Sequence, residues 1–204
     1  MMKIYLIAAL TLLITFSSFN QINGYSTDIQ SKAEVGVPAP DFILEDQNGN
    51  SFSLSNFKDK IVILEWLNPD CPFVQRHYKS NTMTSLASNY SDNGVVWLAI
   101  NSTHTMNKDD DKKWIGKYSL QYPILDDSSG NVGKLYGAKT TPNMFIIDKS
   151  GTLIYAGAID DDPDGSKGEN KVNYVEKALK EVITGNPVSI SETKPYGCSV
   201  KYSK

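Results

Sequence analysis

The sequence is poor in three residue types that often carry catalysis or metal binding. Its 204 residues include only two cysteines, two histidines and one arginine. His77 and His104 lie far from any metal-ligand spacing, so we expect no metal site, and we expect no cofactor. The net charge of −3 leaves no surplus of basic residues to bind phosphates, which argues against nucleic acid as a partner.

Long hydrophobic runs are also scarce, and the main one lies near the first residue. Lys3 precedes an apolar run, Ile4 to Phe16, and polar residues follow. This layout is typical of a secretory signal peptide and is short for a membrane span. With no cysteine near the junction, a lipid anchor on cysteine is excluded. We therefore expect residues 1–24 to be a signal peptide, mature protein from about Tyr25, and export to the periplasm or cell envelope. An uncleaved N-terminal anchor is the alternative, and it would be the sole contact with a membrane.

The remainder of the chain has the composition of one folded domain with short appendages. Apolar residues make up 40% of the sequence and aromatic residues 10%, enough for a core. Small and polar residues predict a linker over 25–36, and the prolines that follow favour an extended entry into the domain. We expect the domain to span 37–186 and a C-terminal tail, 187–204, to carry Cys198.

Apolar periodicity within the domain predicts alternating strands and helices. Strands are expected at 42–45, 51–54, 61–66, 94–101, 122–125, 144–148 and 153–158, and helices at 72–90, 108–119, 131–136 and 171–184. The nearly continuous apolar run at 61–66 is typical of a strand buried on both faces. Alternation predicts a parallel portion and the late hairpin adds antiparallel strands, so the class is an α/β sandwich around a mixed sheet.

Cys71 is the candidate nucleophile because of its position between a strand and a helix. It follows the strand at 61–66, and Pro72 suits the first position of a helix. Chemistry gathers at such strand ends, and a helix N-terminus favours thiolate over thiol. The neighbouring carboxylate of Asp70 opposes a second anion, so the sign of the net pKa shift stays open. The alternative is a buried, inert cysteine.

Five separated segments resemble the thioredoxin-like superfamily, and more closely its peroxiredoxin-like redoxin group, which is related to alkyl hydroperoxide reductases and thiol-specific antioxidant proteins. The segments are NPDCPFV at 68–74, WLAIN at 97–101, YGAKTTPNMFIID at 136–148, YAGAIDD at 155–161 and KPYGCSVKY at 194–202. They recur in order between Val37 and Tyr202. The resemblance implies a thioredoxin-like three-layer sandwich, with a mixed central sheet flanked by helices.

The resemblance also implies roles for residues around Cys71. Thr141 and Pro142 match the family's cis-proline loop, so we expect a cis peptide bond facing Cys71. Together with Pro72 they are the expected substrate contacts. Glu65 takes the place, six positions before the cysteine, where the family often has a buried carboxylate. It would relay a proton if burial raises its pKa, whereas a strand-end carboxylate paired with lysine is the alternative.

Two departures from the family limit the chemistry. Thioredoxins have a second cysteine three residues after the first, and here that place holds Val74. Typical peroxiredoxins have a threonine three positions before the cysteine and a distant arginine. Here the threonine place holds Asn68, and no arginine follows Arg76. Asn68 and Asp70 remain candidate catalytic neighbours of the sulfur.

Cys198 is the candidate replacement for the missing second cysteine. If the tail folds over the site, Cys198 could resolve a mixed disulfide formed on Cys71. A permanent staple is the alternative, worth about 5 kcal/mol for a loop of this length. The predicted function is an exported thiol–disulfide oxidoreductase acting on protein or small-molecule thiols and disulfides, with an external thiol as reductant. A peroxiredoxin-like hydroperoxide reductase and a catalytically silent binding module with a structural disulfide are the alternatives.

Two other polar features are expected to lie outside the chemistry. His77 is predicted to be a partly buried packing residue. The acidic segment 160–165 imitates half of a calcium loop, but Lys171 stands at the twelfth position and a proline interrupts the ligands. A solvated acidic loop is therefore expected there.

Overall fold

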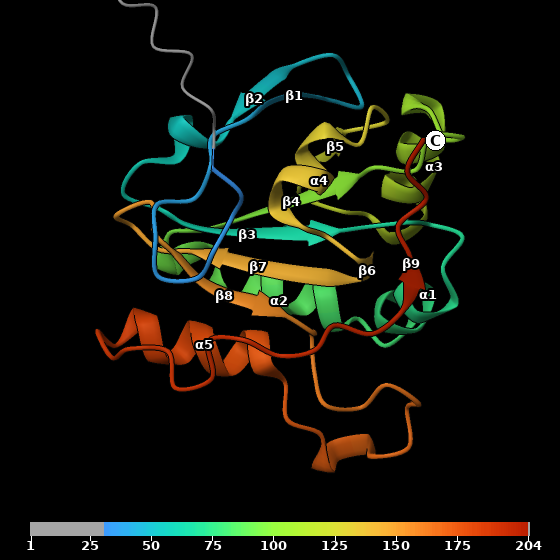
Figure 1. Ribbon diagram of the computed structural model, residues 1–204. Coiled ribbons are helices and arrows are strands. Elements are labelled where there is room, and N and C mark those ends of the chain that lie inside the picture. Colours follow the sequence, from blue (N-terminus) through green and yellow to red (C-terminus); the bar gives the residue numbers. More distant parts are fainter. Residues whose placement is uncertain (1–30, 204) are drawn as a thin grey trace, which may run out of the picture.

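The computed structural model describes residues 31–203 (Figure 1). The strands are β1 (Ile43–Asp46), β2 (Ser51–Ser53), β3 (Ile61–Trp66), β4 (Val95–Asn101), β5 (Ile124–Asp126), β6 (Thr140–Thr141), β7 (Asn143–Ile147), β8 (Leu153–Gly157) and β9 (Cys198–Ser199). The helices are α1 (Pro72–Lys79), α2 (Thr82–Tyr90), α3 (Lys108–Tyr118), α4 (Asn131–Tyr136) and α5 (Tyr174–Ile183), with short 3₁₀ turns η1 (Leu54–Phe57), η2 (Ser91–Asn93) and η3 (Gly168–Asn170).

A seven-stranded mixed sheet forms the middle layer, with the order β2-β1-β5-β4-β3-β7-β8. β3 pairs in parallel with β4, and β4 with β5, while the remaining pairs are antiparallel. Every residue of β3 is buried, as the continuous apolar run predicted. The predicted mixed sheet is thus confirmed, and β3 leads directly toward Cys71.

Helices cover both faces of this sheet and give three layers. Ile61 and Ile63 of β3 face a core that includes side chains of α1, α2, α3 and α5. Val62 and Leu64 face the opposite core, where α4 packs. This alternation follows from the two-residue period of a strand. The arrangement is visible in Figure 1, with α4 on one side of the central strands and α2 on the other.

Two predicted helices differ from those in the structure. The helix expected over 72–90 is two helices, because α1 ends at Lys79 and Asn81 adopts a left-handed conformation (φ 55°) before α2. Asparagine is among the few residues that tolerate this conformation. The last helix begins at Tyr174 and not at Lys171, since the side chain of Asn173 accepts the Glu176 N–H and caps it.

The C-terminal tail returns from α5 along β8 and then crosses the end of the sheet. Ala156 N–H donates to the Ser191 carbonyl, and Thr193 N–H donates to the Ala156 carbonyl. The tail then forms β9, which pairs with β6 in a separate two-stranded sheet. In Figure 1 this red segment passes from α5 to the vicinity of α1.

The segment before the domain also contacts it. Ala33 N–H donates to the Leu135 carbonyl, and Gly36 N–H donates to the Leu153 carbonyl, so part of the predicted linker 25–36 lies against the domain. The predicted signal peptide, 1–24, lies outside the described residues. Within residues 31–203, no helix has the length and apolar character needed to cross a membrane.

Candidate redox site

Cys71 lies between the end of β3 and the first turn of α1. It is the N-cap residue of α1, and Pro72 is the first helical residue. Its backbone N–H donates to the Asn68 carbonyl at 3.0 Å, and its carbonyl accepts the Gln75 N–H at 2.9 Å. The residue is only 1% exposed. The sulfur is therefore held at a helix N-terminus, where partial positive charge favours an anion.

The cis-proline loop lies directly against this sulfur. The Thr141–Pro142 peptide bond is cis, which confirms the prediction from the sequence. Trp66 of β3 is paired with Asn143 of β7, and this register brings the residues after β3 and those before β7 to one edge of the sheet. The Cys71 thiol donates a hydrogen bond to the Thr141 carbonyl oxygen at 2.9 Å. Thr141 and Pro142 are both buried.

The tail brings the second cysteine to the same point. In the β6–β9 pair, Cys198 is the direct partner of Thr141, the residue whose carbonyl contacts Cys71. The Cys198 side chain lies beside Cys71, close enough to shift its pKa, and both cysteines are free. Gly197 (φ 138°) permits this approach, because an added Cβ would overlap the Thr141 carbonyl oxygen. The two cysteines thus both adjoin Thr141 although 126 residues separate them in the sequence.

The two sulfurs have opposite pKa shifts. Burial raises the pKa of Cys71, but interactions with the side chains of Cys198 and Thr141 and with the backbone N–H groups of Val74 and Cys198 outweigh burial and lower it. The pKa of Cys198 is raised to about 11 by burial and by the neighbouring Cys71 sulfur. Cys71 is therefore the sulfur that ionises first. The direction of the Cys71 pKa shift, which the sequence left open, is therefore downward.

Glu65 is a fully buried carboxylate on β3, 0% exposed. Its Oε2 accepts hydrogen bonds from Trp97 Nε1 at 2.8 Å and from the Tyr78 hydroxyl at 3.1 Å. The Tyr78 hydroxyl also contacts the Tyr122 hydroxyl at 3.0 Å. Burial raises the pKa of Glu65 to about 7, although the two hydrogen bonds to Trp97 and Tyr78 lower it. The alternative of a strand-end carboxylate paired with lysine is wrong, because aromatic donors surround this group.

The remaining predicted neighbours shape the loop before Cys71. Asn68 is buried, and its Oδ1 accepts the Asp70 N–H at 2.8 Å. The Asp70 side chain is exposed. A side chain that bonds to the backbone two residues later stabilises a turn. Asn68 thus holds the turn that presents Cys71 to α1.

The sequence did not reveal a polar network that fixes the tail two residues before Cys198. Tyr196 contacts His77 of α1, with 3.0 Å between the hydroxyl and Nε2, and its hydroxyl also donates to the Asp160 carboxylate. His77 and Asp160 are both buried. His77 is thus a packing residue as predicted, although it is fully buried and also hydrogen-bonded. The prediction of a solvated loop is wrong at Asp160, because this carboxylate is buried through its bond to Tyr196. The only sequence signal was the proximity of Tyr196 to Cys198.

The acidic segment 160–165 is held together by an ion pair and by hydrogen bonds to the backbone. Across residues 31–203, no three His, Cys, Asp or Glu side chains are arranged to hold a metal ion. Asp161 instead pairs with Lys167, and Asp162 accepts the backbone N–H groups of Ser166 and Lys167. These bonds give the segment a folded loop structure of its own.

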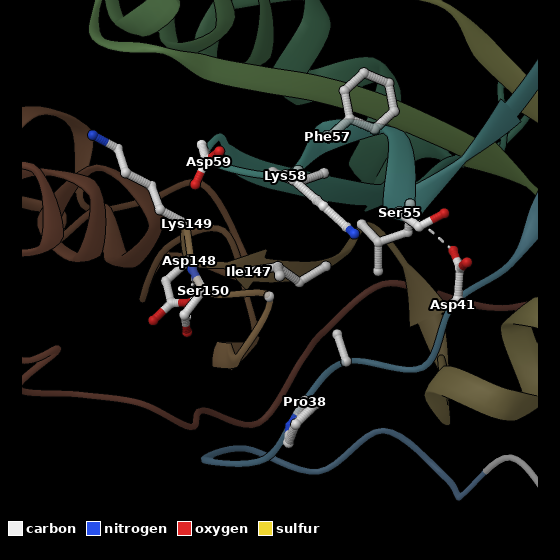
Figure 2. A pocket seen from close by; sticks show the side chains of 14 residues that line it. Pro38, Asp41, Ser55, Phe57, Lys58, Asp59, Ile147, Asp148, Lys149 and Ser150 are labelled. Carbon is white, nitrogen blue, oxygen red and sulfur yellow. Dashed lines mark hydrogen bonds between the residues drawn. The ribbon is translucent and has the colours of Figure 1, made fainter.

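A cavity of about 490 Å³ lies at the other end of β3 (Figure 2). Leu54, Val62 and Ile147 contribute apolar surface, and Figure 2 shows charged side chains such as Lys58 and Asp59 at its rim. Val62 is near the start of β3, whereas Cys71 follows its end. The cavity is therefore separate from the two cysteines.

The sheet, the cis-proline loop and the paired thiols define a redox protein of the thioredoxin fold. A sequence profile of the AhpC/TSA family matches residues 35–156, more than half of the chain, so the protein belongs to the AhpC/TSA family. The redoxin resemblance inferred from the five segments is thus confirmed.

Similar proteins agree with this class. The thiol-disulfide oxidoreductase ResA of Bacillus thuringiensis subsp. konkukian (strain 97-27) is 29% identical over 164 residues, covering 80% of this chain and 87% of that protein. The crystal structure of the hypothetical protein SMc02350 from Sinorhizobium meliloti 1021 has a TM-score of 0.74 at 28% identity, covering 85% of this chain and 97% of that one. The thioredoxin domain of thiol-disulfide oxidoreductase BVU-2223 from Bacteroides vulgatus shares the fold, with a TM-score of 0.54 at 21% identity, covering 61% of this chain and 89% of that one.

Proposed function

We propose that this protein is a thiol–disulfide oxidoreductase in which Cys71 is the nucleophile and Cys198 the resolving cysteine. The observation that carries this proposal is the position of the two free cysteines at Thr141, whose carbonyl accepts the Cys71 thiol and which pairs with Cys198 between β6 and β9. Family membership and the similarity to a thiol-disulfide oxidoreductase support the class of reaction.

The first step is attack by the Cys71 thiolate on a substrate disulfide, RS–SR′. A bond forms between the Cys71 sulfur and RS, the S–S bond breaks, and R′S⁻ leaves and takes up a proton. The lowered pKa of Cys71 supports this role, because the thiolate is the nucleophilic form. The hydrogen bonds that Cys71 receives at the N-terminus of α1 stabilise that anion before attack.

The second step is attack by Cys198 on the mixed disulfide. The Cys198 thiol loses its proton, its sulfur bonds to the Cys71 sulfur, and RS⁻ leaves and is protonated. The pKa of Cys198 is raised by burial and by the adjacent Cys71 sulfur. Once Cys71 is part of a mixed disulfide, its negative charge is gone, so that part of the shift disappears and Cys198 ionises more readily. An external dithiol would then reduce the Cys71–Cys198 disulfide.

Glu65 is proposed to exchange protons during this cycle. Its pKa of about 7 means that it can both take up and release a proton near neutral pH. It belongs to the face of β3 that packs on the same core as Cys71 and Tyr78. Ionisation of Glu65 in this low-dielectric region would oppose a thiolate, so its protonation state tunes the reactivity of the sulfur.

The substrate is proposed to bind where the tail now lies. Because Cys71 is 1% exposed, a disulfide reaches it only when the tail moves away from β6. Thr141 and Pro142 would then line one side of the opening, and Pro72 at the start of α1 the other. The substrate is a protein or a small molecule with a disulfide, and the reductant is an external thiol.

Hydroperoxide reduction is the second candidate, and membership of the AhpC/TSA family favours it. The polar groups near Cys71 support hydroperoxide reduction less well than disulfide exchange. Arg76 is the only arginine of the chain, and its guanidinium donates to the carbonyls of Asp162 and Pro163 and not to the sulfur site. Asn68 uses its side-chain oxygen on the backbone of Asp70. The rate with a disulfide is therefore expected to exceed the rate with a hydroperoxide of similar size.

Export to the periplasm or cell envelope is part of the proposal. It is supported by the signal-peptide pattern of residues 1–24. Disulfide chemistry of this kind suits a compartment where disulfides persist.

Two single substitutions test the proposed mechanism. Cys71→Ser should abolish turnover of a disulfide substrate, because it removes the attacking sulfur. Cys198→Ser should accumulate a mixed disulfide on Cys71, detected as an added mass that a reductant removes. If both variants lose similar stability and neither traps substrate, the two sulfurs form a staple and the mechanism is wrong.

A further inference from the structure

The tail is fixed on both sides of Cys198. After Cys198, Val200 N–H donates to the Lys139 carbonyl at 3.2 Å, and the Tyr202 hydroxyl donates to the Ala138 carbonyl at 2.8 Å. Before Cys198, the fixing contact comes from Tyr196, which lies within a polar network and not against backbone alone. The two sides therefore hold the tail by different chemistry.

The hydroxyl of Tyr196 forms hydrogen bonds with three neighbouring side chains. It donates its single hydrogen to the Asp160 carboxylate. Its oxygen then accepts from His77 Nε2 at 3.0 Å and, more weakly, from Arg76 at 3.4 Å. A tyrosine hydroxyl has one hydrogen to donate, so this assignment fixes the proton of His77 on Nε2. The Tyr196 hydroxyl and the His77 Nε2 thus have defined donor and acceptor roles.

The network also joins the tail to the helix that presents the nucleophile. Arg76 and His77 lie on α1, which begins immediately after Cys71, and Asp160 follows β8. The guanidinium of Arg76 lies 5.8 Å from the ring centres of both Phe73 and Tyr196, and these rings are 6.0 Å apart. Arg76 also donates to the Asp162 carbonyl at 2.7 Å. Movement of Tyr196 would therefore break contacts with two separate elements.

We propose that Tyr196 is a positioning residue whose hydroxyl network holds Cys198 against Cys71 and keeps the tail closed over the site. The proposal rests on the proposed function, in which Cys198 resolves the mixed disulfide. Only Gly197 separates Tyr196 from Cys198, and its backbone lies directly on the Thr141 carbonyl. If Tyr196 were released, the backbone beside Cys198 would no longer be fixed, and Cys198 could move away from Cys71.

The protonation states of the network support a permanent hydrogen-bonded contact at neutral pH. The pKa of His77 is lowered to about 4, because burial and the charges of Arg76 and Lys171 outweigh the raising effect of Asp160 and Asp162. His77 is then neutral. Burial and the Asp160 carboxylate raise the pKa of Tyr196, so its hydroxyl keeps the hydrogen that it donates.

The test measures access to Cys71 and needs no catalytic turnover. In a Cys198→Ser background, Cys71 is the only cysteine, and its rate of alkylation by a bulky maleimide reports tail opening. Tyr196→Phe keeps the ring but removes the hydroxyl. Tyr90→Phe is the matched control, because its hydroxyl donates to Glu176 at 3.4 Å and links α2 to α5, away from the tail.

Tyr196→Phe should raise the alkylation rate of Cys71 about tenfold to a hundredfold, since hydrogen bonds to charged groups contribute roughly 1.5–3 kcal/mol. Tyr90→Phe should stay within about twofold of the background. The double variant Tyr196→Phe, Asp160→Asn also removes the buried charge of Asp160 and should expose Cys71 to the same extent. If the Tyr196 variants react within about twofold of Tyr90→Phe, Tyr196 only packs and the proposal is overturned.

The protein with both cysteines supplies a second readout. Tyr196→Phe should lower the equilibrium constant for forming the Cys71–Cys198 disulfide against glutathione by about tenfold or more, because the effective concentration of Cys198 falls. An unchanged constant would contradict the positioning role. If Cys198→Ser turns over substrate like the wild type, the two-cysteine mechanism fails, whereas the alkylation result still reports the hold that Tyr196 has on the tail.

Discussion

The buried carboxylate of Glu65 should make stability fall as pH rises. In the folded protein its pKa is about 7, against an ordinary value of 4.5. The native state therefore keeps a proton that the unfolded chain has already released between these pH values. Because stability falls with pH wherever the native state binds more protons, the loss begins near pH 4.5 and is complete above pH 7.

The size of this effect follows from the two pKa values. One pKa unit corresponds to about 1.36 kcal/mol, so the shift as a whole corresponds to about 3 kcal/mol. Between pH 5 and pH 8 the linkage relation gives a loss of about 2.5 kcal/mol from this one group. Glu65→Gln has no ionisation, so the free energy of unfolding of the variant relative to wild type should rise by about that amount over this range.

Urea unfolding at pH 5, 6, 7 and 8 measures the difference directly. Asp111→Asn is a useful control, because burial raises the pKa of Asp111 to about 6 in a separate contact with Asn101. It should flatten the stability curve at lower pH and leave the ionisation near pH 7 in place. In turnover assays, Glu65→Gln should also remove an ionisation near pH 7 from the pH–rate profile. A stability difference between Glu65→Gln and wild type that stays constant from pH 5 to pH 8 would refute the assignment of this carboxylate.

Three further predictions address the other parts of the site. Gly197→Ala should displace the tail, because the added Cβ overlaps the Thr141 carbonyl oxygen, and it should lower the yield of the intramolecular disulfide in a non-reducing gel; normal yield would contradict the close approach. Trp97→Phe should raise the pKa of Glu65 further, because it removes a donor to the carboxylate. Infrared spectroscopy of the carboxyl band checks this, and a lowered pKa would rule it out. The exported protein should begin near Tyr25 and be soluble, as mass spectrometry can establish, whereas a membrane-bound form that keeps Met1 would disprove cleavage.

The parts of the site that the sequence predicted are those fixed by local rules. Cys71 was located from a continuous apolar strand and a proline that suits a helix start, and both elements are found as expected. The cis bond before Pro142 and the carboxylate at Glu65 came from the family resemblance, and the structure contains the cis bond and buries the carboxylate. Such features depend on a few neighbouring residues, which a sequence displays directly.

The parts that escaped prediction depend on distant partners or on backbone conformation. The break between α1 and α2 rests on the left-handed conformation of Asn81, which the apolar pattern does not record. β6 and β9 have two residues each and form only because they pair with one another. The polar network joins His77 to Tyr196 across 119 positions, so no window of sequence contains both. Burial of polar residues becomes favourable only when all partners are assembled.

The unequal sulfurs argue that the Cys71–Cys198 pair is a working couple and not a permanent staple. Burial and the Cys71 sulfur raise the pKa of Cys198, while the thiol of Cys198 helps lower that of Cys71. This stabilisation of the Cys71 thiolate by the neighbouring Cys198 thiol is available only in the reduced protein. Stabilising the reduced state makes a disulfide easier to reduce, whereas structural disulfides typically have potentials below about −300 mV. We therefore expect the pair to equilibrate with glutathione at a potential above about −300 mV. A potential well below that value would mean that the packed tail stabilises the disulfide more than the neighbouring thiol stabilises the reduced protein. Cys198 would then contribute to stability and not to turnover.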